Sequence, residues 1–312
     1  MGMIQRDFPL SARVLHMLEG SDGPVTPIAP ARPAATVMLL RDRSGEPTAT
    51  DGSGAGACEG VDAASAPEGV DADSAPDGVD VFVMRRVATM AFAAGVTVFP
   101  GGGVDARDDD PDLPWRGPAP QHWARILGVE EDLARCLVVA AAREVFEECG
   151  VLLAAPRDEG PMPDLTAGPW PGLRDALVRR EVAFATVLEE HDLELRTDVL
   201  RASARWVAPE FEPRRYDTFF FVARVPRGQQ PDGRTSEAQT AGWARPQAVL
   251  DEASAGRVTL LPPTLVHLEQ LAQAPDVAHV LAREPDPIPL PIVLPTVVTR
   301  DGRLVLTCEV PT

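Results

Sequence analysis

The segment REVFEECG, residues 143–150, crowds three glutamates into a stretch with a helical pattern. A helix turns by about 100° per residue, so Glu144, Glu147 and Glu148 share one face although their like charges repel each other. Apolar residues fall on the opposite face, and Gly150 suits the left-handed conformation that ends many helices. The segment therefore predicts a packed helix with an acidic edge, which is either a solvated surface or a site for a divalent cation with oxygen ligands.

The charge of the chain restricts its partners and its chemistry. The 312 residues carry a formal net charge of −18, and all 29 basic residues are arginine. An acidic surface disfavours nucleic acids and anionic membranes as partners. The lack of lysine excludes Schiff-base chemistry and the P-loop lysine. An anionic substrate would need metal ions or local arginines to neutralise it.

Cysteine and histidine are spaced unlike the ligands of zinc sites. The four cysteines form no CxxC pair and the five histidines form no HxxxH pair, so we expect a reduced protein without zinc. The first twenty residues contain no apolar stretch long enough for a signal peptide or a membrane span, and the final EVPT is no prenylation signal. We expect a cytoplasmic protein without a membrane partner, and a homodimer remains compatible with the sequence.

Helical patterns interrupt a mixed set of strand patterns, so we predict an α+β protein with a mixed sheet. The predicted strands are 34–40, 79–86, 204–209, 215–226 and an edge strand that ends the segment 288–308. The predicted helices are 130–149, 176–195, 261–274 and a short one that follows a strand within 236–256. Leu133 and Leu137 project near the glutamate face of helix 130–149, so either that helix is broken or another segment covers its first half.

A low-complexity segment, residues 43–78, separates the first two predicted strands. The tripeptide Gly-Val-Asp recurs at Gly60, Gly69 and Gly78, with small, acidic and proline residues between the copies. This composition favours a flexible hairpin insertion, because it offers too little apolar surface to fold alone. A calcium-binding acidic repeat is the alternative interpretation.

The sequence REVFEECGV, residues 143–151, resembles the second half of the Nudix box, G-x5-E-x7-R-E-U-x-E-E-x-G-U with U apolar. Upstream, PGGGVDARD supplies the box glycine as Gly102, and the first box glutamate falls on Asp108 or Asp105. Residues 109–142 separate Asp108 from Arg143, where the family has seven residues. A long insertion at this place is similar to the branch that includes the peroxisomal coenzyme A diphosphatases and their bacterial relatives.

The resemblance implies one domain over residues 1–312, with a Nudix-type α/β/α sandwich around a mixed sheet. The family core would span about residues 34–274. Within that core we expect the flexible insertion at 43–78 and an insertion inside the box at 109–129. After it we expect a C-terminal extension at 275–312.

The resemblance also implies a metal-dependent hydrolase of a nucleoside diphosphate linked to another group, with the pyrophosphate of coenzyme A or acyl-coenzyme A as the substrate bond. A diphosphatase for ADP-ribose, a dinucleotide or a nucleotide sugar is one alternative, and a regulator that binds nucleotides without turnover is another. The cofactor would be Mg²⁺ or Mn²⁺. The expected ligands are Glu147 and Glu148, with Glu144, Asp108 and the backbone of Gly101 and Gly102.

Further roles follow from the same resemblance. Arg143 would clamp a carboxylate through its planar fork. The general base would be one of the three helix glutamates or Glu237, and the sequence does not choose among them. The candidates for gripping phosphate are two arginine pairs next to predicted strands, for which ordinary surface charge is the alternative: Arg214, Arg215, Arg85 and Arg86.

Overall fold

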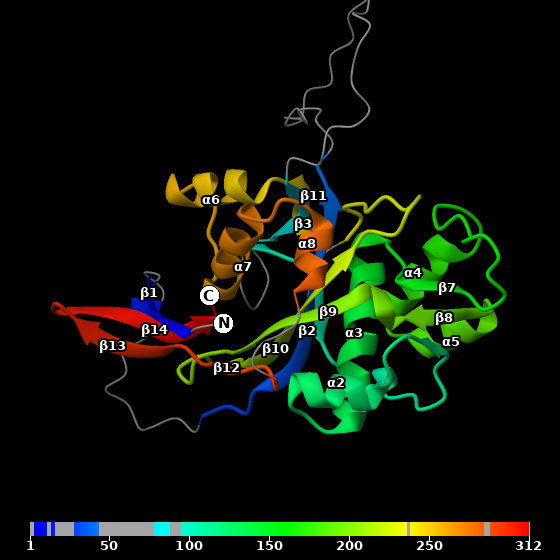
Figure 1. Cartoon of the computed structure of the whole chain (residues 1–312), viewed down its shortest axis with the longest axis horizontal. Coiled ribbons are helices and arrows are strands. Elements are labelled where there is room, and N and C mark those ends of the chain that lie inside the picture. Colours follow the sequence, from blue (N-terminus) through cyan, green and yellow to red (C-terminus); the bar gives the residue numbers. More distant parts are fainter. Residues whose placement is uncertain are drawn as a thin grey trace, which may run out of the picture.

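The computed structural model describes residues 3–10, 14–15, 28–43, 78–87, 95–235, 238–283 and 288–311. Its centre is a mixed eight-stranded sheet with the order β11-β3-β2-β10-β9-β12, while β4 pairs with β3 and β5 pairs with β2 (Figure 1). β10 runs parallel to β2, and β3 and β9 run antiparallel to their neighbours β2 and β10. The strands are β2 (Arg32–Asp42), β3 (Val79–Arg86), β4 (Thr97–Val98), β5 (Gly101–Gly103), β9 (Leu200–Val207), β10 (Tyr216–Arg224), β11 (Ala238–Ala244) and β12 (Ile292–Val293).

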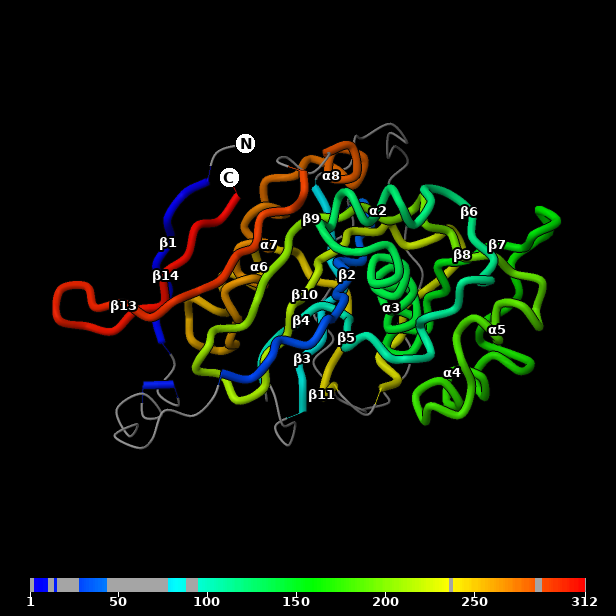
Figure 2. The backbone as a smooth tube through the Cα atoms, turned by 90° about the horizontal axis from the view of Figure 1, so that it is seen from below, coloured from blue at the N-terminus to red at the C-terminus, as the bar shows by residue number. Residues whose placement is uncertain are grey.

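Helices cover both faces of this sheet. α2 (Pro120–Leu127) and α3 (Glu131–Cys149) lie on one face, and α6 (Pro246–Ser254), α7 (Pro262–Ala272) and α8 (Val277–Ala282) lie on the other (Figures 1 and 2). The described part of the chain thus has the three layers that the sequence predicts, which confirms the α+β class and the α/β/α sandwich.

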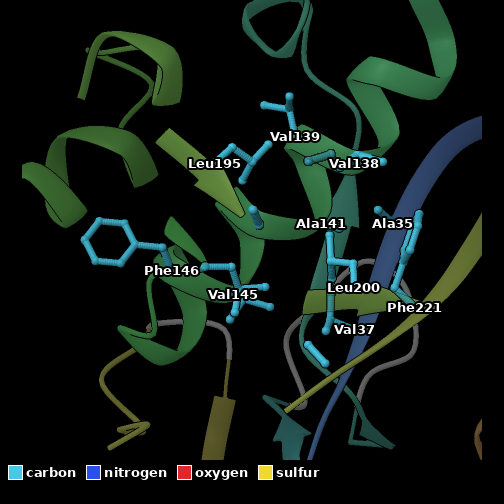
Figure 3. Close-up of a cluster of buried hydrophobic side chains, with 14 of the residues drawn as sticks. Ala35, Val37, Val138, Val139, Ala141, Val145, Phe146, Leu195, Leu200 and Phe221 are labelled. Atoms are coloured by element: carbon cyan, nitrogen blue, oxygen red, sulfur yellow. The ribbon is translucent and has the colours of Figure 1, made fainter. Parts of the chain in front are cut away.

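Alternate residues of the strands supply two separate cores. In β2, Ala35 and Val37 pack into the core under α3, whereas Met38 and Leu40 pack into the core under α7. Successive strand residues point to opposite faces, so one apolar strand serves both layers. Figure 3 shows the first of these cores, where Val138, Ala141 and Val145 of α3 meet Ala35, Val37 and Phe221 of the sheet.

The box helix α3 is continuous, and α2 packs against its first half. Leu137 is fully buried there, next to Trp123 of α2, which is 2% exposed and lies 5.9 Å from the ring of Phe221. Of the two explanations for apolar residues near the glutamate face, the covering segment is therefore the correct one. Gly150 ends α3 in the left-handed conformation, with φ of 70° and its N–H on the carbonyl of Phe146, as predicted.

The helix predicted over residues 176–195 is wrong. That region contains α4 (Trp170–Val178), α5 (Phe184–Glu190) and a strand, β8 (Leu193–Arg196). Arg180 and Asp192 adopt positive φ values of 60° and 52°, so the chain turns at both positions. Within each short helix the apolar spacing is helical, but it does not continue through the turns. β8 joins a small sheet in the order β6-β8-β7, with β6 (Trp115–Arg116) and β7 (Ala154–Pro156).

The first and last described segments form a second small sheet in the order β1-β14-β13, made of β1 (Met3–Pro9), β14 (Arg303–Pro311) and β13 (Thr296–Arg300). The sequence did not predict β1, and β14 is the central strand rather than an edge strand. Phe8 and Val310 of this sheet pack into the core under α7. Residues 275–312 thus contribute α8, two strands of this sheet (β13 and β14) and β12, which pairs with β9 of the main sheet.

β2 and β3 form the predicted hairpin pair, with Leu40 opposite Val81. Residues 44–77 of the predicted insertion, with Gly60 and Gly69 of the repeat, lie outside the described residues. Two short 3₁₀ turns, η1 (Ala106–Asp108) and η2 (Thr197–Val199), complete the fold. In the ranges that the structure covers, no helix combines the length and the apolar character needed to span a bilayer.

His267 of α7 lies in the core under that helix. It is 2% exposed, its ring lies 4.8 Å from the ring of Phe220, and its Nε2 atom has no hydrogen-bond partner among the described residues. Burial lowers the pKa of His267 from 6.5 to about 4, because the imidazolium would lose its hydration. The folded protein therefore keeps this ring neutral at pH values where the unfolded chain protonates it.

We predict that His267→Leu weakens the loss of stability in acid. Between pH 6.5 and 4 the unfolded state binds more protons at His267 than the folded state, so the wild-type free energy of unfolding falls as the pH drops. The difference between wild type and variant should change by about 3 kcal/mol from neutral pH to the lower end of that window. Urea unfolding at several pH values measures this. His279→Leu, at an exposed histidine, is the control and should keep the wild-type profile; a pH-independent difference for His267→Leu would contradict the assignment.

Candidate active site

The glutamates of α3 lie against the backbone of β5. The N–H of Gly101 donates to Oε2 of Glu148 at 2.7 Å. A Cβ atom on Gly102 would lie 2.5 Å from Oε1 of Glu144, and one on Gly101 would lie 2.4 Å from the carbonyl oxygen of Ala35. A side chain on Gly102 would strike the carboxylate of Glu144 on α3, and one on Gly101 would strike the backbone of β2. Glycine is required here by close approach, which is the reason that the sequence pattern suggested.

Arg143 is the centre of the site. It is 6% exposed, and its Nε and Nη2 atoms donate to the two carboxylate oxygens of Asp108 at 2.8 and 3.0 Å. Its Nη1 atom donates to Glu144 at 2.7 Å and to Glu147 at 3.2 Å, and Nη2 also donates to the carbonyl of Gly103 at 3.0 Å. Burial opposes its charge, but Asp108 and Glu144 more than compensate and raise the pKa of Arg143. The predicted clamp exists and holds three carboxylates.

Asp108 does not have the surroundings expected of a metal ligand. Its side chain is 1% exposed, and both oxygens are engaged by Arg143, with a further hydrogen bond from the N–H of Asp105 at 2.8 Å. Asp105 instead pairs with Arg107, whose hydrogen bonds lower the pKa of that carboxyl group. Of the two candidates for the first box position, Asp108 is therefore the one that pairs with Arg143 and balances its charge.

The remaining carboxylates carry unbalanced negative charge. Burial raises the pKa of Glu144 to about 7, against the attraction of Arg143 and together with repulsion by Glu147. Burial also raises the pKa of Glu147. A divalent cation would relieve this repulsion, and carboxylate and backbone oxygens are the donors that hard cations take. Within the described ranges, however, no three side chains of ligand type are gathered around one point.

The two arginines next to β10 differ in their surroundings. Arg215 donates to the carbonyls of Ala208 and Ala29, both at 3.0 Å, so it ties two backbone segments together instead of facing a phosphate. Arg214 is exposed at the start of β10, near the end of β2 that carries β5. Of this pair, only Arg214 stays a candidate for phosphate.

The two arginines of β3 lie on opposite faces of the sheet. Phe82 and Met84 pack under α3, whereas Val81 packs under α7. By strand alternation Arg86 shares the face of the box helix and Arg85 does not, which corrects the expectation that both converge beside the box. Glu237, the fourth candidate base, lies outside the described residues.

Arg174 of α4 is a residue that the sequence reasoning missed. It is 5% exposed; Nε donates to the carbonyl of Glu147 at 2.9 Å, Nη1 to Asp232 at 2.8 Å and Nη2 to the carbonyl of Arg234 at 3.1 Å. The N–H of Asp232 donates to the carbonyl of Cys149 at 2.9 Å. Arg174 thus fastens the last turn of the box helix to the segment that leads into β11. No spacing in the sequence links these three elements.

Comparisons with known proteins identify related sequences. The family model of the NUDT19 Nudix domain matches residues 125–271, which include Arg143 and all three helix glutamates. This segment of the chain therefore matches the Nudix hydrolase superfamily. Proteins of this superfamily generally use divalent metal ions.

Two curated relatives are similar to this Nudix protein. Putative nudix hydrolase 7 of Caenorhabditis elegans is 29% identical over 198 residues, which cover 63% of this chain and 57% of the relative. Human acyl-coenzyme A diphosphatase NUDT19 is 28% identical over 231 residues, which cover 62% of this chain and 60% of the relative. The chain thus spans less than two thirds of the length of either relative.

A solved structure shares the fold. The crystal structure of a NUDIX hydrolase from Alicyclobacillus acidocaldarius superposes with a TM-score of 0.61 at 24% sequence identity, over 82% of this chain and 98% of the other. At this identity the likeness supports the fold alone.

We predict that Asp108→Asn lowers the free energy of unfolding by about 3 kcal/mol, because it leaves a buried guanidinium without its bidentate counterion. Asp108→Glu keeps the charge and should lose less. Urea unfolding at neutral pH measures both variants. A loss as large for Asp108→Glu would show that the length of this side chain matters as much as its charge, and no loss for Asp108→Asn would contradict the prediction.

Proposed function

We propose that this Nudix protein hydrolyses the pyrophosphate of coenzyme A or an acyl-coenzyme A with the help of Mg²⁺ or Mn²⁺. The observation that carries the reaction class is the group of Glu144, Glu147 and Glu148 beside the Gly101 backbone, organised by Arg143. The substrate rests on the similarity to a human protein named acyl-coenzyme A diphosphatase.

Glu147 and Glu148 would hold the cation, with Glu144 and the backbone of Gly101 and Gly102 as further donors. Bound there, the cation would offset the negative charge of the substrate and make a nearby water more acidic. Arg143 holds Glu144 and Glu147 through hydrogen bonds, and the Gly101 N–H orients Glu148. One of the three glutamates, or Glu237, accepts the proton of the attacking water.

A substrate panel tests the proposal. Purified protein with Mg²⁺ or Mn²⁺ is incubated with coenzyme A, acyl-coenzyme A, ADP-ribose, a dinucleotide and a nucleotide sugar, and the products are identified by mass. Cleavage of coenzyme A compounds into a 3′,5′-ADP and a phosphopantetheine product supports the proposal. Faster cleavage of ADP-ribose or a dinucleotide would show that this compound, and not coenzyme A, is the substrate. Binding without any cleavage would favour a nucleotide-binding regulator.

We predict that Glu147→Gln and Glu148→Gln each lower turnover at least about a hundredfold while the fold is kept, because each removes a metal-binding charge without removing volume. EDTA should abolish turnover of the wild type, and Mg²⁺ or Mn²⁺ should restore it. Glu130→Gln, at an exposed glutamate just before the same helix, is the matched control. A Glu147→Gln/Glu148→Gln double variant with wild-type turnover would refute the metal assignment.

We also predict that Arg214→Ala raises KM for coenzyme A more than for dephospho-coenzyme A, because only coenzyme A carries the 3′-phosphate that a free arginine would grip. Arg125→Ala, at an exposed arginine of α2, is the control. Steady-state kinetics on both substrates give the comparison. Equal increases would assign Arg214 to the pyrophosphate, and no increase would remove it from the site.

A further inference from the structure

A cavity of about 520 Å³ lies on the face of the main sheet opposite α3. Strands β9 and β10, helices α7 and α8 and the strand β14 enclose it, and its apolar wall includes Met38, Trp206, Val222, Val266 and Leu271. All five belong to the core under α7. This volume is in the range of small-molecule sites, and the wall suits an aliphatic group.

The cavity is separate from the box. Gly102 of β5 pairs with Ala35 of β2, whereas Met38, which lines the cavity, lies three residues further along β2. Three residues of a strand span about 10 Å. The cavity also lies on the other face of the sheet, so the substrate of the box does not explain it.

Arg201 lines both the cavity and the adjoining hollow, whose volume is about 270 Å³. A β-bulge puts it there. The register of β9 against β10 shifts between Phe220 and Phe221, so that Phe221 faces Ala202 and Phe220 faces Ala204, with Ser203 left over. Arg201 then pairs with Val222 and shares its face, the one under α7.

The guanidinium of Arg201 has an unused edge. Its Nη1 atom donates to the carbonyls of Leu200 at 2.9 Å and Asp198 at 3.4 Å. Its Nε atom is buried without a hydrogen-bond partner, and within the described chain no hydrogen bond uses the edge formed by Nε and Nη2. That edge is the fork that binds a carboxylate through two parallel hydrogen bonds. A buried donor without a partner costs free energy, which an acceptor would recover.

The charge around the two hollows has the opposite sign to the protein. Their walls carry five arginines and two carboxylates, Asp198 and Glu269, in a chain with a net charge of −18. The arginines are Arg6, Arg201, Arg224, Arg227 and Arg283. Arg6 pairs with Glu269, Arg224 pairs with Asp42, and Asp198 pairs with Arg196. The excess of positive charge therefore comes from Arg201 and its neighbour Arg227. An anion is the ligand that such a surface attracts.

We propose that this cavity binds an aliphatic carboxylate, with the carboxylate on the Nε and Nη2 edge of Arg201 and the chain along the wall of Met38, Trp206 and Val266. The ligand needs both a carboxylate and an aliphatic chain, because the arginine edge binds a planar anion and the wall of the cavity is apolar. The site involves no residue of the box and does not depend on hydrolysis.

The test is calorimetric titration of the full-length protein with decanoate, in EDTA so that the box holds no metal. Decanol is the uncharged probe of the same chain length, and inorganic phosphate is the anion without a chain. We expect decanoate to bind more tightly than either. Arg201→Gln should weaken decanoate by about tenfold or more and leave decanol unchanged. Arg125→Gln, at an exposed arginine of α2, is the matched control and should bind as wild type does.

A second variant protects the test against a folding defect. Ser203→Phe fills the cavity at the bulge while Arg201 stays intact, and it should weaken both decanoate and decanol. Glu147→Gln should bind decanoate as wild type does, which separates this site from the box whether or not the proposed hydrolysis is correct. The proposal is overturned if decanol binds as tightly as decanoate, if phosphate alone binds as tightly, if Arg201→Gln has no effect, or if Glu147→Gln abolishes binding.

Discussion

The buried ion pair between Arg143 and Asp108 is the interaction on which the site depends. Three glutamates at the end of one helix repel each other, and burial makes each charge more costly. Arg143 offsets both effects from inside the helix, with hydrogen bonds to Asp108, Glu144 and Glu147. Because Asp108 takes up two of the donor atoms, the guanidinium is fixed in one orientation. The acidic edge can therefore lie against a glycine strand instead of facing solvent.

Arginine can hydrogen-bond to several carboxylates and carbonyls at once in a way that lysine cannot. Arg143 contacts three carboxylates and one carbonyl, and Arg174 contacts one carboxylate and two carbonyls, each through a planar group with fixed donor directions. One holds the glutamate side chains, and the other holds the last turn of the same helix. A compact ammonium group could not bridge as many acceptors in known directions. The arginine-only composition thus matches the way this site is built.

The parts of the site that the sequence predicted are those within one helix. Helical spacing alone puts Glu144, Glu147 and Glu148 together, places Arg143 beside them and ends the helix at Gly150. The roles of Asp108, Arg215 and Arg174 depend on partners far away in the chain, at Arg143, Ala29 and Asp232, and no local pattern reports such distances. The helix predicted over 176–195 was wrong for a local reason: helical spacing holds within α4 and α5, but the chain turns at Arg180 and Asp192.

Strand alternation likewise predicts which face of the sheet a residue occupies, but it fails where a strand is irregular. It assigns Arg86 to the face of the box helix and Arg85 to the other face without any further information. It fails at β9, where strict alternation would put Arg201 on one face with Arg205, whose guanidinium lies 4.8 Å from the ring of Phe219 in the core under α3. The extra residue of the bulge, Ser203, turns Arg201 to the opposite face. A single inserted residue thus decides which layer of the sandwich receives the partly buried guanidinium of Arg201, and with it the charge of the cavity on the face of the sheet opposite α3.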